Sequence, residues 1–164
     1  MNLNKKFKTN QEKFWVNKLG NKYINRNLKG NNRTYTIGKA LKLNKVSINS
    51  ALEIGCNVGY NLDALKKIYK NIELYGVEIN RKAYKIVNKK YFCFNESILN
   101  FKTNKKFDLV FTAGVLIHQN PKYLKHIYKK MYDLSKKYIY ISEYFNPTPI
   151  TVRYRKHKNK LFKR

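Results

Sequence analysis

The stretch Ala51-Leu52-Glu53-Ile54-Gly55-Cys56-Asn57-Val58-Gly59 decides the fold of this chain. A short apolar run contains one acidic residue, and two glycines follow before a segment in which Leu62, Leu65 and Ile68 recur at intervals of three. Glycines let the backbone turn tightly against a ligand, and the start of a helix offers free N–H groups. The stretch therefore predicts a strand, a ligand-binding turn and an amphipathic helix.

Short apolar strands alternate with amphipathic helices from Ser50 onward, which predicts a parallel sheet built from βαβ units. Residues 1–45 are polar with scattered aromatic residues, and helical spacing within them, as over 34–43, predicts an N-terminal helical preamble or lid. Residues 46–164 are expected to form one α/β domain with a mostly parallel central sheet flanked by helices and, after Asn146-Pro147-Thr148-Pro149, a basic tail. The expected strands span residues 50–54, 73–78, 91–94, 107–112 and 138–142.

A carboxylate stands at the end of the second strand, because Glu78 follows Gly59 by 19 residues. Such a carboxylate can accept hydrogen bonds from both ribose hydroxyls, in NAD-binding folds and in folds that bind S-adenosylmethionine (SAM). A dinucleotide fingerprint that starts at Gly55 needs a second glycine at 57 and glycine or alanine at 60, where this chain has Asn57 and Tyr60. The residues therefore favour SAM, whose positive sulfonium and amino groups suit an acid at position 53. A purely structural turn in an unrelated α/β protein is the alternative.

Three motifs closely resemble those of class I SAM-dependent methyltransferases: Glu53-Ile-Gly-Cys-Asn-Val-Gly59, Gly76-Val-Glu78 and Phe107-Asp-Leu-Val-Phe111. More narrowly, the chain resembles the pseudaminic acid biosynthesis-associated methylases in Phe14-Trp15, Tyr23-Ile-Asn-Arg-Asn27, Gly114-Val-Leu-Ile-His118, Glu143-Tyr-Phe-Asn-Pro-Thr-Pro149, Tyr154-Arg155 and Leu161-Phe-Lys-Arg164. The resemblance implies a Rossmann-like fold, methyl transfer from SAM, and a sugar or sugar-nucleotide acceptor of the nonulosonic (pseudaminic) acid pathway. Members of that family usually run on into further strands, so the fold is expected to be truncated after its fifth strand.

The cofactor is expected at the carboxyl edge of the sheet, where ligands of open α/β folds bind. Ser97 occupies a place where, by the resemblance, many class I methyltransferases carry an adenine-contacting Asp, although a plain turn residue is an equal alternative. The small residues that end the strand over 107–112 leave room for the sulfonium, or serve helix packing. The candidate cofactor-binding residues are Glu53, Gly55, Cys56, Asn57, Gly59, Glu78, Ile79, Ser97, Ile98, Thr112 and Gly114.

Catalysis by methyl transfer depends mainly on alignment and needs no metal, for which the sequence shows no ligand spacing. His118 is the first candidate for a general base because it follows the strand over 107–112 at the ligand edge, although it can also cap or pack the next helix. Glu143 and Tyr144 lie at the same edge after the fifth strand. Arg153 and Arg155 follow the rigid turn and can grip the carboxylate of an acidic sugar, or they belong to a solvated tail.

The net charge of +27 is also what a nucleic-acid-binding protein shows. The cations are 30 Lys and only 6 Arg, whereas base and phosphate readers favour the guanidinium fork of Arg. We therefore interpret the charge as mainly compositional and expect any nucleic-acid binding to be nonspecific. An RNA or DNA methyltransferase and a non-catalytic interaction protein remain the alternatives. The chain has no apolar run of membrane-spanning length, no secretory leader and no cysteine framework, which predicts a cytoplasmic protein.

Overall fold

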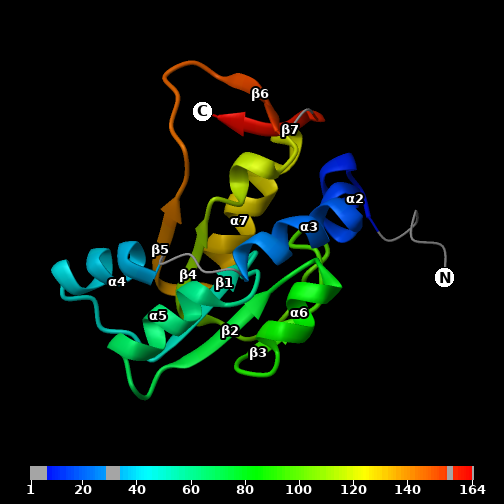
Figure 1. The fold of residues 1–164 in the computed structure, drawn as a ribbon. Helices are drawn as coiled ribbons and strands as arrows, with labels where there is room; N and C mark the ends of the chain where they lie inside the picture. The colour runs from blue at the N-terminus through cyan, green and yellow to red at the C-terminus, as the bar shows by residue number, and fades with distance from the viewer. Residues whose placement is uncertain (1–6, 29–33, 155–156, 164) are drawn as a thin grey trace.

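The computed structural model describes residues 7–28, 34–154 and 157–163, and its centre is a five-stranded parallel sheet (Figure 1). The order along the sheet is β3-β2-β1-β4-β5, so the strand order reverses beside β1. Ligands of open α/β sheets bind at the carboxyl ends of the strands next to such a reversal. The strands are β1 (Ser50–Ile54), β2 (Glu73–Val77), β3 (Phe92–Phe94), β4 (Phe107–Ala113) and β5 (Ser135–Ser142).

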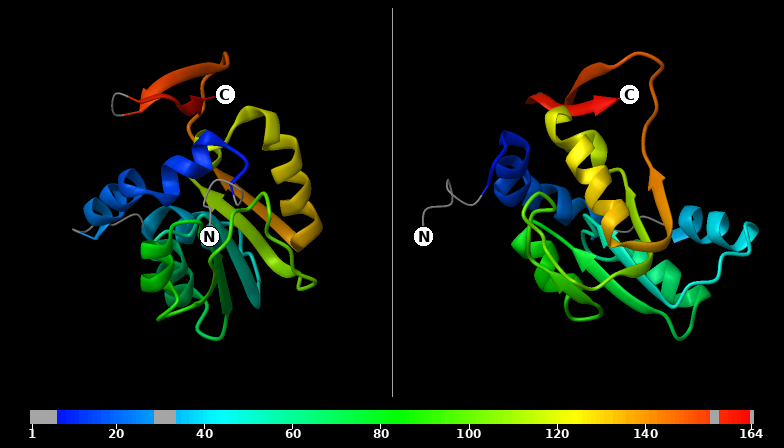
Figure 2. Two further views of the ribbon diagram at one scale, coloured as in Figure 1. Left: turned by 90° about the vertical axis from the view of Figure 1, so that its right-hand side faces the viewer. Right: turned by 180° about the vertical axis from the view of Figure 1, so that it is seen from behind.

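Helices cover both faces of the sheet, as the left view of Figure 2 shows. One face packs against α4 (Thr34–Leu43), α5 (Tyr60–Ile68) and α6 (Arg81–Val87), and the other against α7 (Leu124–Leu134). Because apolar residues are needed on both sides, β1 and β4 consist almost entirely of buried residues rather than alternating ones. The Rossmann-like α/β fold expected from the sequence is confirmed.

Two short helices near the N-terminus, α2 (Asn10–Val16) and α3 (Lys18–Asn27), lie beside the carboxyl ends of the central strands (Figure 1). Thr9 and Glu12 form a capping box at the start of α2, in which Glu12 N donates to Thr9 Oγ1 at 3.1 Å and Thr9 N donates to Glu12 Oε2 at 2.7 Å. Asn17 ends α2 and caps α3. Helices α2 and α3 therefore belong to the same body as the sheet, and their role as a lid stays a prediction.

The residues after β5 differ from the expected basic tail. They form β6 (Ile150–Tyr154) and β7 (His157–Lys163), a two-stranded antiparallel sheet separate from the central one. The β-branched residues of β6 favour extended backbone, and Val152 pairs with Leu161 of β7. The many Lys and Arg residues of this stretch hide the pattern of a strand in the sequence, which is why a tail is expected there. β5 also begins at Ser135 rather than 138, because the residue that caps α7 already has extended backbone.

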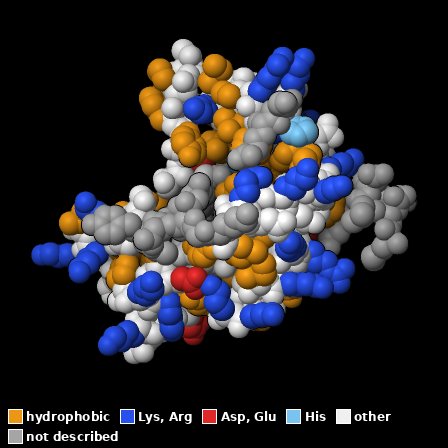
Figure 3. Space-filling model, in the orientation of Figure 1, with side chains coloured by type: hydrophobic (Ala, Val, Ile, Leu, Met, Phe, Trp, Pro, Cys, Tyr) orange, Lys and Arg blue, Asp and Glu red, His pale blue; other side chains and the backbone are white. Residues whose placement is uncertain are grey.

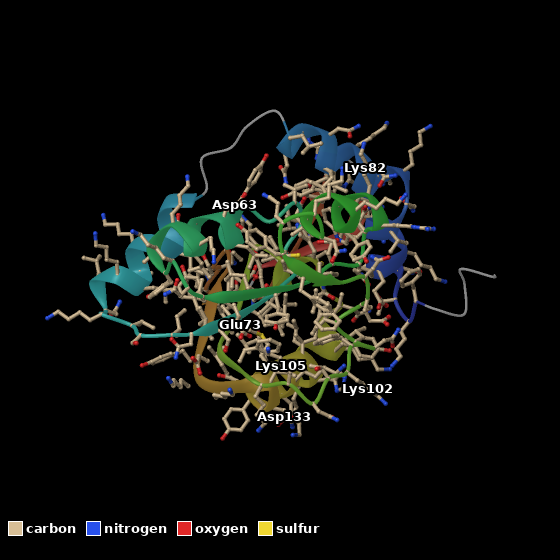
Figure 4. All side chains as sticks on the ribbon, turned by 90° about the horizontal axis from the view of Figure 1, so that it is seen from below. Asp63, Glu73, Lys82, Lys102, Lys105 and Asp133 are labelled. Carbon is tan, nitrogen blue, oxygen red and sulfur yellow. The ribbon has the colours of Figure 1, made fainter. Side chains whose placement is uncertain are left out.

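Lys and Arg side chains are spread over the face drawn in Figure 3 rather than gathered in one patch. Three acids at or near the surface each pair with a lysine, and Figure 4 shows one such pair, Glu73 and Lys105, side by side. The pairs are Asp63–Lys90 at 2.6 Å, Glu73–Lys105 at 2.7 Å and Asp133–Lys129 at 2.8 Å. Exposed ion pairs of this kind contribute little to stability. Within the described ranges, no helix is long and apolar enough to cross a bilayer.

Candidate functional site

The turn between β1 and α5 is built from left-handed backbone at three positions. The φ angle is +72° at Gly55, +50° at Asn57 and +89° at Gly59, a region that glycine enters without strain and asparagine tolerates. The N–H groups of Gly55 and Cys56 donate to the carbonyl of Val77 at 2.8 and 3.2 Å, which joins the turn to the end of β2. The two glycines predicted for cofactor binding are therefore required by the backbone of the turn itself.

A cleft opens at the carboxyl ends of β1, β2 and β4 and encloses about 890 Å³ of space that is partly open to solvent. The predicted site residues that line it are Glu53, Gly55, Cys56, Asn57, Glu78, Ile79, Gly114 and His118. Lining residues that sequence reasoning missed include Trp15, Tyr23, Asn61, Asn80 and Gln119.

Glu53 is buried at the cleft, with 2% of its surface exposed. Its Oε1 accepts a hydrogen bond from Asn61 Nδ2 at 2.6 Å, whereas its Oε2 has no partner among the described residues. Burial, opposed by the bond from Asn61, raises the pKa of Glu53 to about 8. Asn57 Oδ1 is also buried without a partner in the described part of the chain. Leaving buried acceptors unpaired is unfavourable, so both oxygens are suited to N–H donors of a ligand.

Glu78 follows β2 and is held by two backbone groups. Its Oε2 accepts from the N–H of Asn57 at 2.8 Å, and its Oε1 accepts from the N–H of Asn80 at 2.7 Å. Burial raises the pKa of Glu78, and these backbone hydrogen bonds oppose the shift. The carboxylate is therefore fixed in orientation, and each oxygen keeps a further lone pair for a ligand hydroxyl.

Asn80 joins the N-terminal helices to the edge of the sheet. Its Oδ1 accepts from the N–H groups of Lys82 and Ala83 and so caps α6. Its Nδ2 donates to the carbonyl of Trp15 at 2.8 Å and to Asn21 Oδ1 at 3.0 Å. The sequence indicated only the helix cap, because the other two partners lie 65 and 59 positions away.

A second recess adjoins the cleft. The two share Trp15, Gly55, Ile79, Val115 and Gln119 in their linings. Ser97 and Ile98, both predicted to contact the cofactor, line this recess together with Glu12 of α2. Ser97 Oγ donates to Glu12 Oε1, and Glu12 is 3% exposed. The recess therefore has apolar walls and two acidic residues, Glu12 and Glu96, both of which sequence reasoning missed.

Two predicted cofactor residues, Thr112 and Gly59, line neither the cleft nor the recess, and a third, Cys56, lines the cleft but its thiol contacts another cysteine. Thr112 is fully buried, and its hydroxyl donates to the carbonyl of Ile54 at 3.1 Å. The Cys56 thiol lies 3.7 Å from the Cys93 sulfur, and this contact, together with burial, raises the pKa of Cys56. Gly59 starts α5.

The predicted catalytic residues lie in different surroundings. His118, at the end of η1 (Leu116–His118), lines the cleft, and burial lowers its pKa. Glu143 accepts the N–H groups of residues 115–117 at 2.9, 2.8 and 3.3 Å, so it stabilises the turn that carries His118. Tyr144 is 58% exposed and is not part of the cleft lining.

In its described lining, the cleft lacks the cations that dominate the rest of the chain. Its described lining contains two glutamates and no Lys or Arg, although the chain holds 36 of these cations. Arg153, predicted to bind substrate, is exposed on β6 and does not line the cleft. Arg155 lies outside the described residues. Nowhere in the described ranges do three His, Cys, Asp or Glu side chains gather as a metal-binding group.

Solved methyltransferase structures share this fold at low sequence identity. The plantazolicin methyltransferase BpumL, solved with SAH, has a TM-score of 0.66 and 18% identity, covering 82% of this chain and 57% of its own. The sugar N-methyltransferase KedS8 from Streptoalloteichus has a TM-score of 0.63 and 13% identity, with 83% and 61% covered. A SAM-dependent methyltransferase from Clostridium acetobutylicum has a TM-score of 0.62 and 13% identity, with 82% and 64% covered. The chain thus spans less than two thirds of each of these proteins.

The sequence itself identifies the family. A search of curated proteins finds no match. A family model described as a methyltransferase domain matches residues 51–137, which include the glycine turn, Glu78 and β4. This match covers more than half of the chain. The chain therefore belongs to the methyltransferase domain family.

Proposed function

We propose that the chain is a SAM-dependent methyltransferase. The observation that carries the proposal is Glu53 Oε2, a buried oxygen without a donor in the described residues, beside a cleft whose described lining has no Lys or Arg. SAM has a positive amino group and a positive sulfonium and no phosphate, so it matches this environment and can supply the missing donor. Membership of the methyltransferase domain family and the shared fold support the same assignment.

Each part of the site has a distinct role in the proposed complex. Glu53 accepts from the amino group of the cofactor, and Glu78 accepts from the ribose hydroxyls with its remaining lone pairs. The apolar walls of the recess, including Ile79 and Ile98, hold the adenine ring, with Ser97 at its polar edge. The cofactor therefore spans the cleft and the adjoining recess.

The chain's contribution to the reaction is alignment. SAM supplies a methyl group that its sulfonium already activates. The buried carboxylates hold the donor in one orientation, which turns the encounter with the acceptor into an effectively unimolecular step. Trp15 of α2 and Tyr23 of α3 line the same cleft and reduce access of water to the reacting atoms.

Calorimetric titration of the purified chain with SAM, SAH and NAD tests the cofactor assignment. We expect saturable binding of SAM and SAH and none of NAD, because the turn lacks the glycines that let a pyrophosphate approach. Saturable binding of NAD without binding of SAM contradicts the proposal.

For the acceptor, we propose a sugar or sugar-nucleotide of the nonulosonic (pseudaminic) acid pathway, which the motif resemblance supports. Since the cleft lining contains carboxylates, an acidic group of the acceptor is expected outside it. We expect that group near Arg153, which is exposed on the C-terminal hairpin formed by β6 and β7. The net charge of +27 draws anions and raises their association rate more than their affinity. Mass spectrometry after incubation with SAM compares pseudaminic acid with a neutral hexose. Faster methylation of the acid is expected, and equal rates remove the acceptor assignment alone.

A further inference from the structure

Aromatic rings from both ends of the chain meet at His118. Its ring centroid lies 4.7 Å from that of Trp15 in α2 and 5.0 Å from that of Tyr154 in β6. Phe14 packs edge-on against Tyr154 and His157 at 6.2 and 5.3 Å. We call these five rings the aromatic junction. Of its members, His118 and Trp15 also line the cleft, so the junction joins the C-terminal hairpin to the candidate site.

One hydrogen bond determines which nitrogen of the His118 ring carries the hydrogen. Nδ1 lies 2.7 Å from the carbonyl oxygen of Lys160 in β7. A carbonyl oxygen can only accept, so Nδ1 must donate, and Nε2 of the neutral ring is then the nitrogen with the free lone pair. Free histidine in water favours the Nε2–H tautomer. The bond to the hairpin carbonyl therefore imposes the Nδ1–H tautomer on His118.

The surroundings of His118 hold the ring in place from two sides. Lys160 also binds α2, because its Nζ donates to the carbonyl of Asn10 at 3.0 Å and lies 5.4 Å from the centroid of Phe14. Glu143 holds the backbone of the turn that precedes His118. The hairpin therefore fixes the ring of His118, and Glu143, which follows β5, separately fixes the backbone before it.

The ionisable groups around His118 leave the ring neutral. Glu143 accepts from backbone N–H groups, the Lys160 ammonium donates to α2, and the ring of His157 packs against Phe14. The aromatic ring of Tyr154 packs against the His118 ring in an edge-to-face arrangement. Burial lowers the pKa of His118, so at neutral pH the ring is unprotonated at Nε2 and able to take up a proton.

We propose that the C-terminal hairpin is a positioning element of the proposed methyltransferase: the Lys160 carbonyl holds His118 as the Nδ1–H tautomer and leaves Nε2 as the general base of the cleft. The O–H or N–H proton of the acceptor passes to Nε2 while the acceptor oxygen or nitrogen forms a bond to the methyl carbon. The carbon–sulfur bond to that methyl breaks, and its electron pair stays on sulfur. His118 then releases the proton to solvent. Tyr154 acts through His118 and is a positioning residue.

NMR of protein labelled with ¹⁵N-histidine reads the tautomer, because long-range couplings distinguish a protonated from an unprotonated ring nitrogen. His118→Gln assigns the signals, and the hydrogen is expected on Nδ1 in the wild type. Tyr154→Ala and Leu161→Ala loosen the hairpin from opposite strands and are expected to shift the ring toward the Nε2–H form. Tyr132→Ala, which removes a ring that is 74% exposed on α7, is the control and leaves the tautomer unchanged. An Nε2–H ring in the wild type, or no response to either hairpin variant, overturns the positioning role.

The base role is tested with SAM and SAH as probes, which differ by one methyl group and the sulfonium charge. A base next to the reacting methyl has a lower pKa with SAM bound than with SAH bound, because the positive charge disfavours a second one nearby. NMR titration of His118 in the two complexes is expected to show this difference. Equal pKa values in both complexes remove the base role. If SAM does not bind, the proposed function and the base role both fail. The NMR measurement of the tautomer uses the free protein, so it tests the positioning role independently.

Discussion

Proton release on SAM binding tests the central contact of the cofactor site. Burial raises the pKa of Glu53 to about 8 in the free protein, so at pH 7 about nine in ten molecules carry a neutral carboxyl there. A positive amino group seated against Oε2 favours the ionised form, and binding then expels the proton. We expect about 0.9 proton released per SAM at pH 7. Affinity is expected to rise about tenfold, or about 1.4 kcal/mol, for each pH unit between about pH 6 and 7.5.

Calorimetry in two buffers with different ionisation enthalpies measures the protons exchanged. Glu53→Gln is the matched variant, because its amide retains the shape of the side chain and cannot ionise. Proton release and most of the pH dependence should disappear in this variant, with weaker binding. Glu73→Gln changes an exposed carboxyl of β2 and should behave as the wild type. Tight binding of SAM without proton release at pH 7 would mean that the amino group does not bind to Glu53.

The same pKa predicts a change in stability without any ligand. The folded-state pKa of about 8 lies above the ordinary value of 4.5, so the contribution of Glu53 is complete below pH 4.5 and is lost as the pH rises toward 8. Relative to Glu53→Gln, the free energy of unfolding of the wild type should fall by about 1.4 kcal/mol per pH unit in this window. Urea unfolding of both proteins at several pH values measures the difference. Parallel pH profiles would contradict the raised pKa.

Three substitutions test other parts of the site. Glu78→Ala should weaken SAM binding by about 1 to 3 kcal/mol in calorimetry, because the ribose hydroxyls lose their acceptor, whereas Glu73→Ala should leave the affinity unchanged. Gly76→Ala places a Cβ 2.4 Å from the Cys56 sulfur, so urea unfolding should show a loss of about 1 to 3 kcal/mol that is smaller in a Cys56→Ala background. Arg153→Lys should slow methylation of pseudaminic acid without changing SAM affinity, because Lys lacks the bidentate fork; an unchanged rate would argue against a carboxylate contact there.

Sequence reasoning places residues correctly in the fold where the determinants are local, and their role in binding stays a prediction. Glu53 and the glycines of the turn lie within nine residues, and Glu78 follows the next strand, so the parallel order of the strands brings them to one edge. It fails where the fold joins distant segments, as when Glu12 meets Ser97 across 85 positions. For Thr112 the prediction holds only in part. The residue lies at the end of β4 as expected, but its hydroxyl donates a hydrogen bond to the carbonyl of Ile54 in β1.

The net charge of the chain and the charge of its cleft favour opposite ligands, and distance decides which of them matters for the cofactor. The Debye length at physiological salt is about 8 Å, so exposed lysines are largely screened from a buried site, whereas buried pairs are screened much less. The amino group of a SAM molecule bound at Glu53 is therefore expected to respond to this nearby carboxylate and not to the net charge of +27. Nucleic acid bound by dispersed lysines is in the opposite situation, because counterion release makes its affinity fall steeply with salt. Filter binding of RNA is expected to collapse between low and physiological salt, while calorimetry of SAM shows little change over the same series. A sequence-selective RNA or DNA complex that persists at about 0.2 M salt would instead favour a nucleic-acid methyltransferase.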